Sequence, residues 1–129
     1  MKNISDIEDK KFIHIENTEW VKKLDFYEDK INFFQGELFE VMKSNPEDEK
    51  TNSHVENYRM LFIEKTNQIK DLRTRIAESE HHFVSAPEDK TLVPAHHKLR
   101  AHMHDWEDNF EVLKINFMKF AADFATPLG

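Results

Sequence analysis

Histidine and glutamate are the side chains in this sequence that could bind a metal ion or exchange protons near neutral pH. The chain has eight histidines and no cysteine, which leaves nitrogen and oxygen atoms as the main ligands. Glu78 and His81 stand three positions apart, a spacing that places two ligands on one face of a helix. Imidazole and carboxylate together suit zinc, iron or manganese. The candidate ligands are Glu78, His81, His82, His96, His97, His104 and Asp108.

A second row of possible ligands belongs to the last third of the chain. His104 and Asp108 are four residues apart, close enough on a helix to hydrogen-bond or to chelate an ion. His97 and Glu111 fall in the same band of the helical surface, and a second helix would have to complete the shell. Both sets have an alternative interpretation as solvated polar side chains. Di-metal carboxylate bundles use two Glu-x-x-His elements on four helices, and this chain supplies one.

The sequence lacks the motifs of common enzyme classes. Without cysteine there is no thiolate nucleophile. Gly36 is the single glycine inside the chain, so there is no glycine-rich phosphate loop or dinucleotide-binding turn. The Gly-x-Ser-x-Gly elbow and the His-Glu-x-x-His pair are also absent. Acidic pairs are too common among 25 Asp and Glu residues to indicate acid-base chemistry. We therefore expect a non-catalytic protein.

Composition favours a folded acidic protein and excludes several partners. The chain has 129 residues, 39% of them hydrophobic and 33% charged, a globular balance that suits one domain over residues 1–129. A net charge of −7 opposes binding to nucleic acid and to anionic membrane surfaces. No apolar run is long enough to span a bilayer, and the first residues lack the apolar core of a secretion signal. We expect a cytoplasmic protein that binds neither nucleic acid nor membrane.

Apolar residues recur at alternating steps of four and three, the spacing of a helical stripe that is buried against partner helices. The stripe in the last third of the chain comprises Leu99, Met103, Trp106, Phe110, Leu113, Phe117, Phe120 and Phe124. The stripe in the first third comprises Trp20, Leu24, Tyr27, Ile31, Phe34, Leu38 and Val41. A less apolar stripe lies between them, with Lys65 and Ser79 interrupting it. Its members are Val55, Tyr58, Phe62, Ile69, Leu72, Ile76 and Phe83.

Capping residues and prolines predict where the three helices begin. Asn17 and Thr18 can cap the first helix. Ser53 and Glu56 form a capping box, in which each side chain satisfies a backbone donor of the other residue. Pro94 suits the first position of the third helix, where its missing N–H is not needed. The predicted helices cover about 18-44, 54-84 and 95-124, and residues 46-52 can add a polar first turn to the second.

Helices of matched length with short connections pack side by side in alternating directions. The expected fold is therefore all-α: an up-down-up antiparallel three-helix bundle with long coiled-coil-like helices, and with residues 1-16 as an N-terminal extension laid over one end. This topology gathers five of the eight histidines at one end. They are His14, His81, His82, His96 and His97. Because protonation would crowd positive charges there, we expect that end to loosen as the pH falls below about 6.5.

Some apolar residues fall on the outer sides of the predicted helices. Phe26 and Phe33 are seven positions apart and lie away from the buried stripe, with Gly36 on the same side. Glycine inside a helix costs about 1 kcal/mol relative to alanine, which a closely approaching backbone or ring could offset. Surplus apolar surface is typical of a protein interface, although each helix of a bundle also widens its stripe to meet two neighbours. The predicted partner-binding residues are Phe26, Phe33, Gly36, Met60, Ile63, Val112 and Ile115.

These observations favour a non-catalytic helical module that binds another protein. The expected partner is a second copy of the chain, held through the outer faces of the first and third helices, or another helical protein, and this function needs no cofactor. The alternative is a metal-binding or di-metal carboxylate and histidine bundle with a sensor or oxidoreductase-like role, which would hold zinc, iron or manganese at the histidine end. Metal content and oligomeric state distinguish the two hypotheses.

Overall fold

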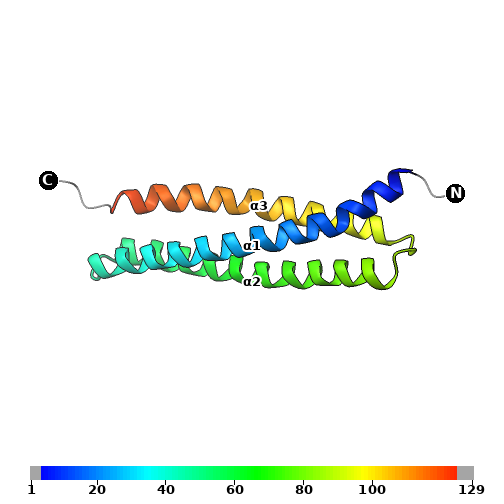
Figure 1. The fold of residues 1–129 in the computed structure, drawn as a ribbon. Helices are drawn as coiled ribbons and strands as arrows, with labels where there is room; N and C mark the ends of the chain where they lie inside the picture. The colour runs from blue at the N-terminus through cyan, green and yellow to red at the C-terminus, as the bar shows by residue number, and fades with distance from the viewer. Residues whose placement is uncertain (1–3, 125–129) are drawn as a thin grey trace.

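The protein is a bundle of three long helices. The computed structural model describes residues 4–124, with side chains from residue 10 onward. Its helices are α1 (Ile4–Ser44), α2 (Glu49–Ser85) and α3 (Leu92–Ala122). They alternate in direction along a common long axis, so that the α1–α2 connection lies at one end and the α2–α3 connection at the other (Figure 1). The predicted up-down-up three-helix bundle is confirmed.

The core is one continuous cluster that runs along the bundle. Buried positions recur at steps of four and three on each helix, as the sequence predicts. The stripes also begin earlier than predicted, because Ile13 of α1 and Leu92 of α3 are buried. Burial of this apolar surface, at about 25 cal/mol per Å², is the main stabilising contribution. The largest fully buried apolar side chains are Phe62, Phe110, Phe117, Ile13, Leu24, Ile31, Ile69, Leu92 and Met103.

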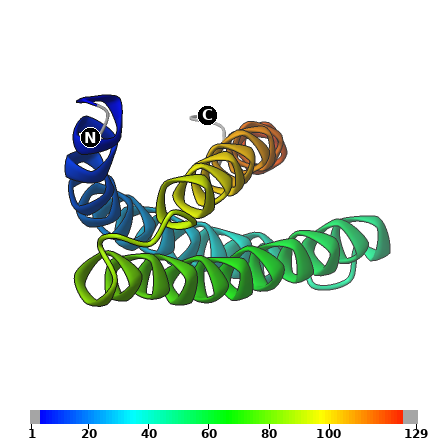
Figure 2. The same ribbon diagram turned by 90° about the vertical axis from the view of Figure 1, so that its right-hand side faces the viewer.

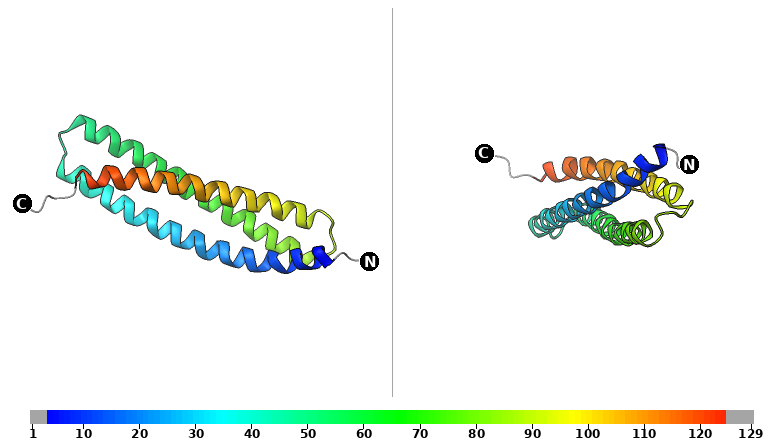
Figure 3. Two further views of the ribbon diagram at one scale, coloured as in Figure 1. Left: turned by 90° about the horizontal axis from the view of Figure 1, so that it is seen from above. Right: turned by 45° about the vertical axis from the view of Figure 1, so that its right-hand side comes forward.

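Aromatic rings hold α3 at a distance from the other two helices. α1 and α2 approach each other more closely than α3 approaches either one, and α3 lies over the groove between them (Figure 2, Figure 3). Tyr27 contacts Trp106 and Phe110, with ring centroids 5.0 and 5.1 Å apart. Phe34 contacts Phe117 at 5.1 Å. Tilted ring pairs of this kind add about 0.5–1.5 kcal/mol each beyond their buried area. Ring packing therefore attaches α3 to the α1–α2 hairpin.

Polar side chains at the edges of the stripes join the helices. Arg73 of α2 contacts two carboxylates of α1, Asp25 at 2.7 Å and Glu28 at 2.8 Å. The Tyr27 hydroxyl donates to Glu107 of α3 at 3.1 Å. Burial and the nearby Glu107 carboxylate raise the pKa of Tyr27 to about 12, so this hydroxyl remains a donor. These contacts align each helix with its neighbours.

The predicted start of the first helix is wrong. α1 begins at Ile4, so residues 4–16 belong to the helix and do not form an extension, while residues 1–3 lie outside the described part of the chain. Asn17 is buried and caps nothing, and the Thr18 hydroxyl donates back to the His14 carbonyl at 2.9 Å. Because Ile13 continues the buried stripe, packing extends the helix through residues whose types favour caps.

The other two helices also begin before their predicted starts. The cap of α2 is Asp48, whose carboxylate accepts from the backbone N–H of Lys50 at 3.1 Å and of Thr51 at 3.4 Å. Ser53 therefore lies inside α2, and the predicted capping box is wrong. Pro94 stands within the first turn of α3, after Leu92, where a missing N–H is still tolerated.

The cap of α2 can be tested with two alanine substitutions. Asp48→Ala should lower the free energy of unfolding by about 1 kcal/mol, because it leaves two first-turn N–H groups without their acceptor. The matched control is Ser53→Ala, which should change the stability by less than about 0.5 kcal/mol. Urea denaturation followed by circular dichroism measures both. A larger loss in the Ser53 variant would contradict the helix start at Glu49.

Candidate functional site

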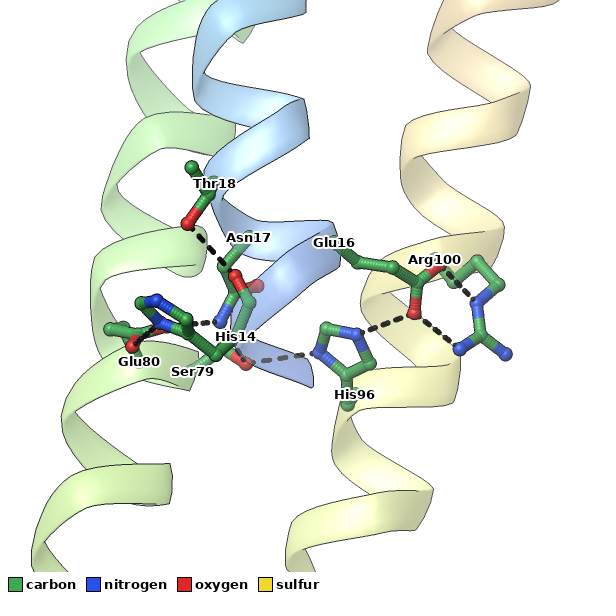
Figure 4. A network of polar contacts seen from close by, with 8 residues as sticks. All are labelled: His14, Glu16, Asn17, Thr18, Ser79, Glu80, His96 and Arg100. Atoms are coloured by element: carbon green, nitrogen blue, oxygen red, sulfur yellow. Dashed lines mark hydrogen bonds and ion pairs between the residues drawn. The ribbon is translucent and has the colours of Figure 1, made fainter. Parts of the chain in front are cut away.

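A layer of polar side chains interrupts the apolar core at the end where the α2–α3 connection lies. Each helix contributes one residue at a core position: Asn17 from α1, Ser79 from α2 and His96 from α3 (Figure 4). Asn17 is 3% exposed and His96 is 2% exposed, and Ser79 is half-buried. We call these three residues the polar layer. Polar groups removed from water in this way require hydrogen-bond partners inside the protein.

Hydrogen bonds run through the polar layer from one helix to the next. The Asn17 side-chain amide donates to the Ser79 hydroxyl at 3.3 Å and to the Glu80 carboxylate at 2.9 Å. The Ser79 hydroxyl lies 3.1 Å from Nδ1 of His96. Nε2 of the same ring lies 3.1 Å from the Glu16 carboxylate of α1. The network therefore connects all three helices.

Charged side chains surround the layer on its solvent side. Arg100 donates two hydrogen bonds to Glu16, one of them from Nε at 2.9 Å, and His14 pairs with Glu80 (Figure 4). Burial alone would raise the pKa of Glu16, but hydrogen bonds from Arg100 and His96 outweigh it and lower that pKa. Burial also opposes ionisation of Glu80, yet bonds from Asn17 and His14 lower its pKa. Both carboxylates are therefore ionised at neutral pH.

His96 is the histidine that the fold encloses. Its side chain is 1% exposed, and its ring stacks on Trp20 with centroids 4.9 Å apart and planes 19° apart. Burial lowers the pKa of His96, while the adjacent Glu16 carboxylate opposes that effect. The ring is therefore neutral at pH 7, with both nitrogens occupied by hydrogen bonds.

The candidate metal ligands do not converge. His82 turns toward Asp89 of the α2–α3 connection, at 2.9 Å, and the backbone N–H of Thr91 together with His82 lowers the pKa of Asp89 to about 2. His96 is committed to the polar layer. The exposed members of the predicted set are Glu78, His81, His97, His104 and Asp108. Among the residues that the structure describes, no three such side chains could hold an ion together, so metal binding stays a prediction without a site.

A cavity of about 330 Å³ opens between α2 and α3 beside the polar layer. Ser79 and His96 form part of its wall and bond to each other. Arg75 is on the same wall, where it contacts His102 at 3.2 Å and pairs with Asp71 at 3.1 Å. The principal polar groups of this cavity are thus already paired within the chain.

Large apolar side chains are exposed around the other half of the bundle. Ring contacts of Phe62 with Phe34 and Phe117, at 5.9 and 5.1 Å, put these three core residues in one layer. Their neighbours Phe33 and Ile63 are exposed at the same level, on α1 and α2. Similar residues lie nearby on all three helices, and we call the whole set the apolar belt. Its members are Phe33, Phe39, Met42, Met60, Ile63, Val112, Ile115 and Met118.

The predicted partner-binding residues are all exposed. Phe26 and Phe33 are 60% and 61% exposed, and five members of the predicted set belong to the apolar belt. Phe26 lies one heptad from the belt, and the Lys30 ammonium stands 5.8 Å from the centre of its ring. At Gly36 an added methyl group would meet nothing within 4 Å, so nothing in the described part of the chain explains the glycine. Whether these residues bind a partner stays a prediction.

The belt also contains a shallow groove of about 310 Å³ between α1 and α2. Phe39 and Met42 form its α1 side, and Ile63 lies on its α2 side. Leu38 and Val55 close it toward the core. The wall is mainly apolar, which is typical of the pockets that receive an anchor side chain at a protein interface.

Comparison of the chain with protein-family models, with curated proteins and with solved structures gives no match. Within residues 4–124, no helix combines the length and the apolar character that crossing a membrane requires.

Asn17 and Ser79 are the site residues that sequence reasoning missed. Asn17 is predicted as a helix cap and Ser79 as an interruption of an apolar stripe, yet Asn17 is buried and Ser79 lies half-buried at a core position. A signal for them exists in the sequence. Counting back from Trp20 and Leu99 with the same steps reaches Asn17 and His96. Polar residues that occupy core positions on three helices at one level indicate a buried network.

The hydrogen bonds of the polar layer can be tested through the serine. Ser79→Ala leaves the buried Nδ1 of His96 without its donor, so it should lower the free energy of unfolding by about 1–3 kcal/mol. Ser85→Ala is the matched control, because that exposed hydroxyl bonds only to the His81 carbonyl one turn earlier on the same helix. It should cost less than about 0.5 kcal/mol. If urea denaturation shows that both variants lose the same free energy of unfolding, a network that depends on Ser79 is contradicted.

Proposed function

We propose that this protein is a non-catalytic interaction module that associates with further copies of itself through the apolar belt. The observation that carries the proposal is the exposure of eight large apolar side chains, on all three helices, in the half of the bundle that contains the α1–α2 connection. Single exposed apolar residues are ordinary on protein surfaces, whereas several on neighbouring helices in one half of a bundle are typical of an interaction site.

The belt is not needed to complete the fold. The core stripes are already buried along all three helices, and the belt residues lie outside them. Phe33 touches only its neighbour Phe34 among the rings, at 6.2 Å, and more than half of it faces water. Removing that surface from water would contribute about 25 cal/mol per Å² to association.

A second copy of the chain is the partner that suits this surface. Standard interfaces bury about 800 Å² on each partner, and any one side of the bundle offers only a few of the belt residues. Two copies supply matching apolar surfaces, since a symmetric interface uses the same patch twice. The groove beside Phe39 and Met42 also provides a pocket for a ring from the other copy.

The first test substitutes the most exposed ring of the belt. Phe33→Asp should reduce the mass measured by light scattering to that of a single chain, 15.4 kDa, because it places an unpaired charge in an apolar interface. The matched control is Val84→Asp, an equally charged change at a residue of α2 that is 69% exposed and lies outside the belt. It should leave the mass of the assembly unchanged.

Two results would overturn this proposal. One is a wild-type protein that is monomeric at tens of micromolar. The other is a Phe33→Asp variant that loses helicity, since the residue would then belong to the core. Each copy carries a net charge of −7, so the wild-type assembly should also become tighter as added salt screens the repulsion. Weakening by salt would indicate charged contacts in place of apolar ones.

A substitution at Gly36 distinguishes an interface in which the backbone of the second copy lies close to this residue from one in which it does not. Gly36→Ala should stabilise the isolated chain by about 0.5–1 kcal/mol, because the site is open and alanine favours the helix. The same methyl group should weaken self-association if the backbone of the second copy approaches Gly36. Urea denaturation at low concentration and light scattering at high concentration measure the two effects. Unchanged association would exclude Gly36 from the interface. The proposed self-association would then be tested by Phe33→Asp alone.

A further inference from the structure

We propose that the polar layer is a proton-operated latch. With His96 neutral, the layer holds the first part of α1 against α2 and α3, and protonation of His96 breaks the hydrogen bonds that hold it against α2. The latch lies at the opposite end of the bundle from the connection between α1 and α2 (Figure 1, Figure 4). Its operation is independent of the proposed self-association.

The direction of the hydrogen bonds requires a neutral ring. The Glu16 carboxylate only accepts, so Nε2 of His96 carries the hydrogen between them. Nδ1 then accepts from the Ser79 hydroxyl. The oxygen of Ser79 in turn accepts from the Asn17 amide. Every donor in this chain of bonds meets an acceptor.

A proton on Nδ1 of His96 turns this nitrogen from an acceptor into a donor. His96 and Ser79 would then present two donors to each other, and the Ser79 hydroxyl would have to find a new acceptor. One acceptor in the same layer is Oδ1 of Asn17, which is buried without a hydrogen-bond partner. To reach it the Asn17 amide must turn over, which removes its other hydrogen bond, to Glu80. Protonation therefore weakens the bonds from α1 to α2, whereas the bond from Nε2 of His96 to Glu16, which joins α3 to α1, is kept and becomes charge-assisted.

The charges that face His96 compensate only in part for a positive ring. On α1, Glu16 is the adjacent acid, and Arg100 of α3 already shares it. On α2, Glu80 lies beyond the Asn17 amide and is paired with His14. The remaining charged or titratable groups near the ring are Arg75, Glu78 and His82 of α2 and His97, Lys98 and His102 of α3. Most of these are basic, and the burial of His96 strengthens their effect.

Release is confined to one end because the bonds of the polar layer hold only the beginning of α1. Asn17 and Glu16 are the residues of α1 in the network, and the ring contacts of the core begin further along at Tyr27 and Phe34. The ring contacts of Tyr27 and Phe34 contain no group that titrates near neutral pH. Loosening should therefore reach from the start of α1 to about Trp20, whose ring stacks on His96.

The pH range follows from the direction of the shift. The pKa of His96 in the folded chain is lowered from 6.5, so the unfolded chain binds the proton more readily. The stabilising contribution of the neutral ring is therefore complete above pH 6.5. It is lost as the pH falls from 6.5 toward the lower folded pKa. The shift comes from burial of one ring and does not require five crowded histidines.

A pH titration of the isotope-labelled wild-type chain by NMR tests the latch without any substitution. The ring signals of His96 should titrate below pH 6.5, and the amide signals of α1 up to Trp20 should change with the same midpoint. Amide signals around Phe34, Phe62 and Phe117 should stay in place. A His96 midpoint at or above 6.5, or constant amide signals at the start of α1, would overturn the proposal.

Two adjacent histidines provide the matched variants. His96→Gln keeps a neutral polar group in the layer and should remove most of the fall in melting temperature between about pH 7.5 and about pH 5.5. His97→Gln changes an exposed ring one position away and should retain the wild-type fall. The same pH dependence in both variants would contradict the latch. If His96→Gln does not fold, the wild-type titration still decides the question.

Discussion

Three helices of similar length each carry a stripe of large apolar side chains, and none of them can remove its stripe from water alone. Burying all three stripes together fixes how the helices lie side by side and how each one is rotated. The position of every other feature follows from that rotation. Asn17 and His96 share the stripes and are drawn inside, whereas Phe33 and Val112 lie outside the stripes and remain in water. The polar layer and the apolar belt are thus two results of one packing arrangement.

The polar layer fixes how far each helix is shifted along the bundle, which the apolar stripes do only weakly. A pattern that repeats every seven residues fits nearly as well when one helix slides by one repeat, so apolar packing alone aligns the helices weakly. A buried polar group tolerates no such shift, because it would leave its partners behind. We infer that Asn17, Ser79 and His96 specify the alignment of the three helices more than they stabilise it. Arg73 adds to this alignment from the surface by pairing with Asp25 and Glu28.

The architecture was predictable from the sequence because the stripes are long and regular, while the helix starts were not. Asn17, Thr18 and Ser53 are residue types that cap helices, yet the same side chains are tolerated within a helix whose packing continues past them. Predicting the site failed for a related reason. Topology brings five histidines to one end, but only the exact rotation of α3 buries His96 and exposes His97. Counting back along the stripe of α3 reaches His96, but the hydrogen-bond partners of that ring lie on α1 and α2, and the stripe does not identify them.

The unequal spacing of the helices has a consequence for the order in which the chain folds. α1 and α2 lie close together and are joined by residues 45–48, so their contacts close a short loop and form at little entropic cost. α3 must bring a row of large rings into register on a surface that exists only once that hairpin has formed. Folding should therefore proceed through docking of α3, and the rings of Trp106, Phe110 and Phe117 should contribute more to the rate of unfolding than to the rate at which the hairpin is nucleated.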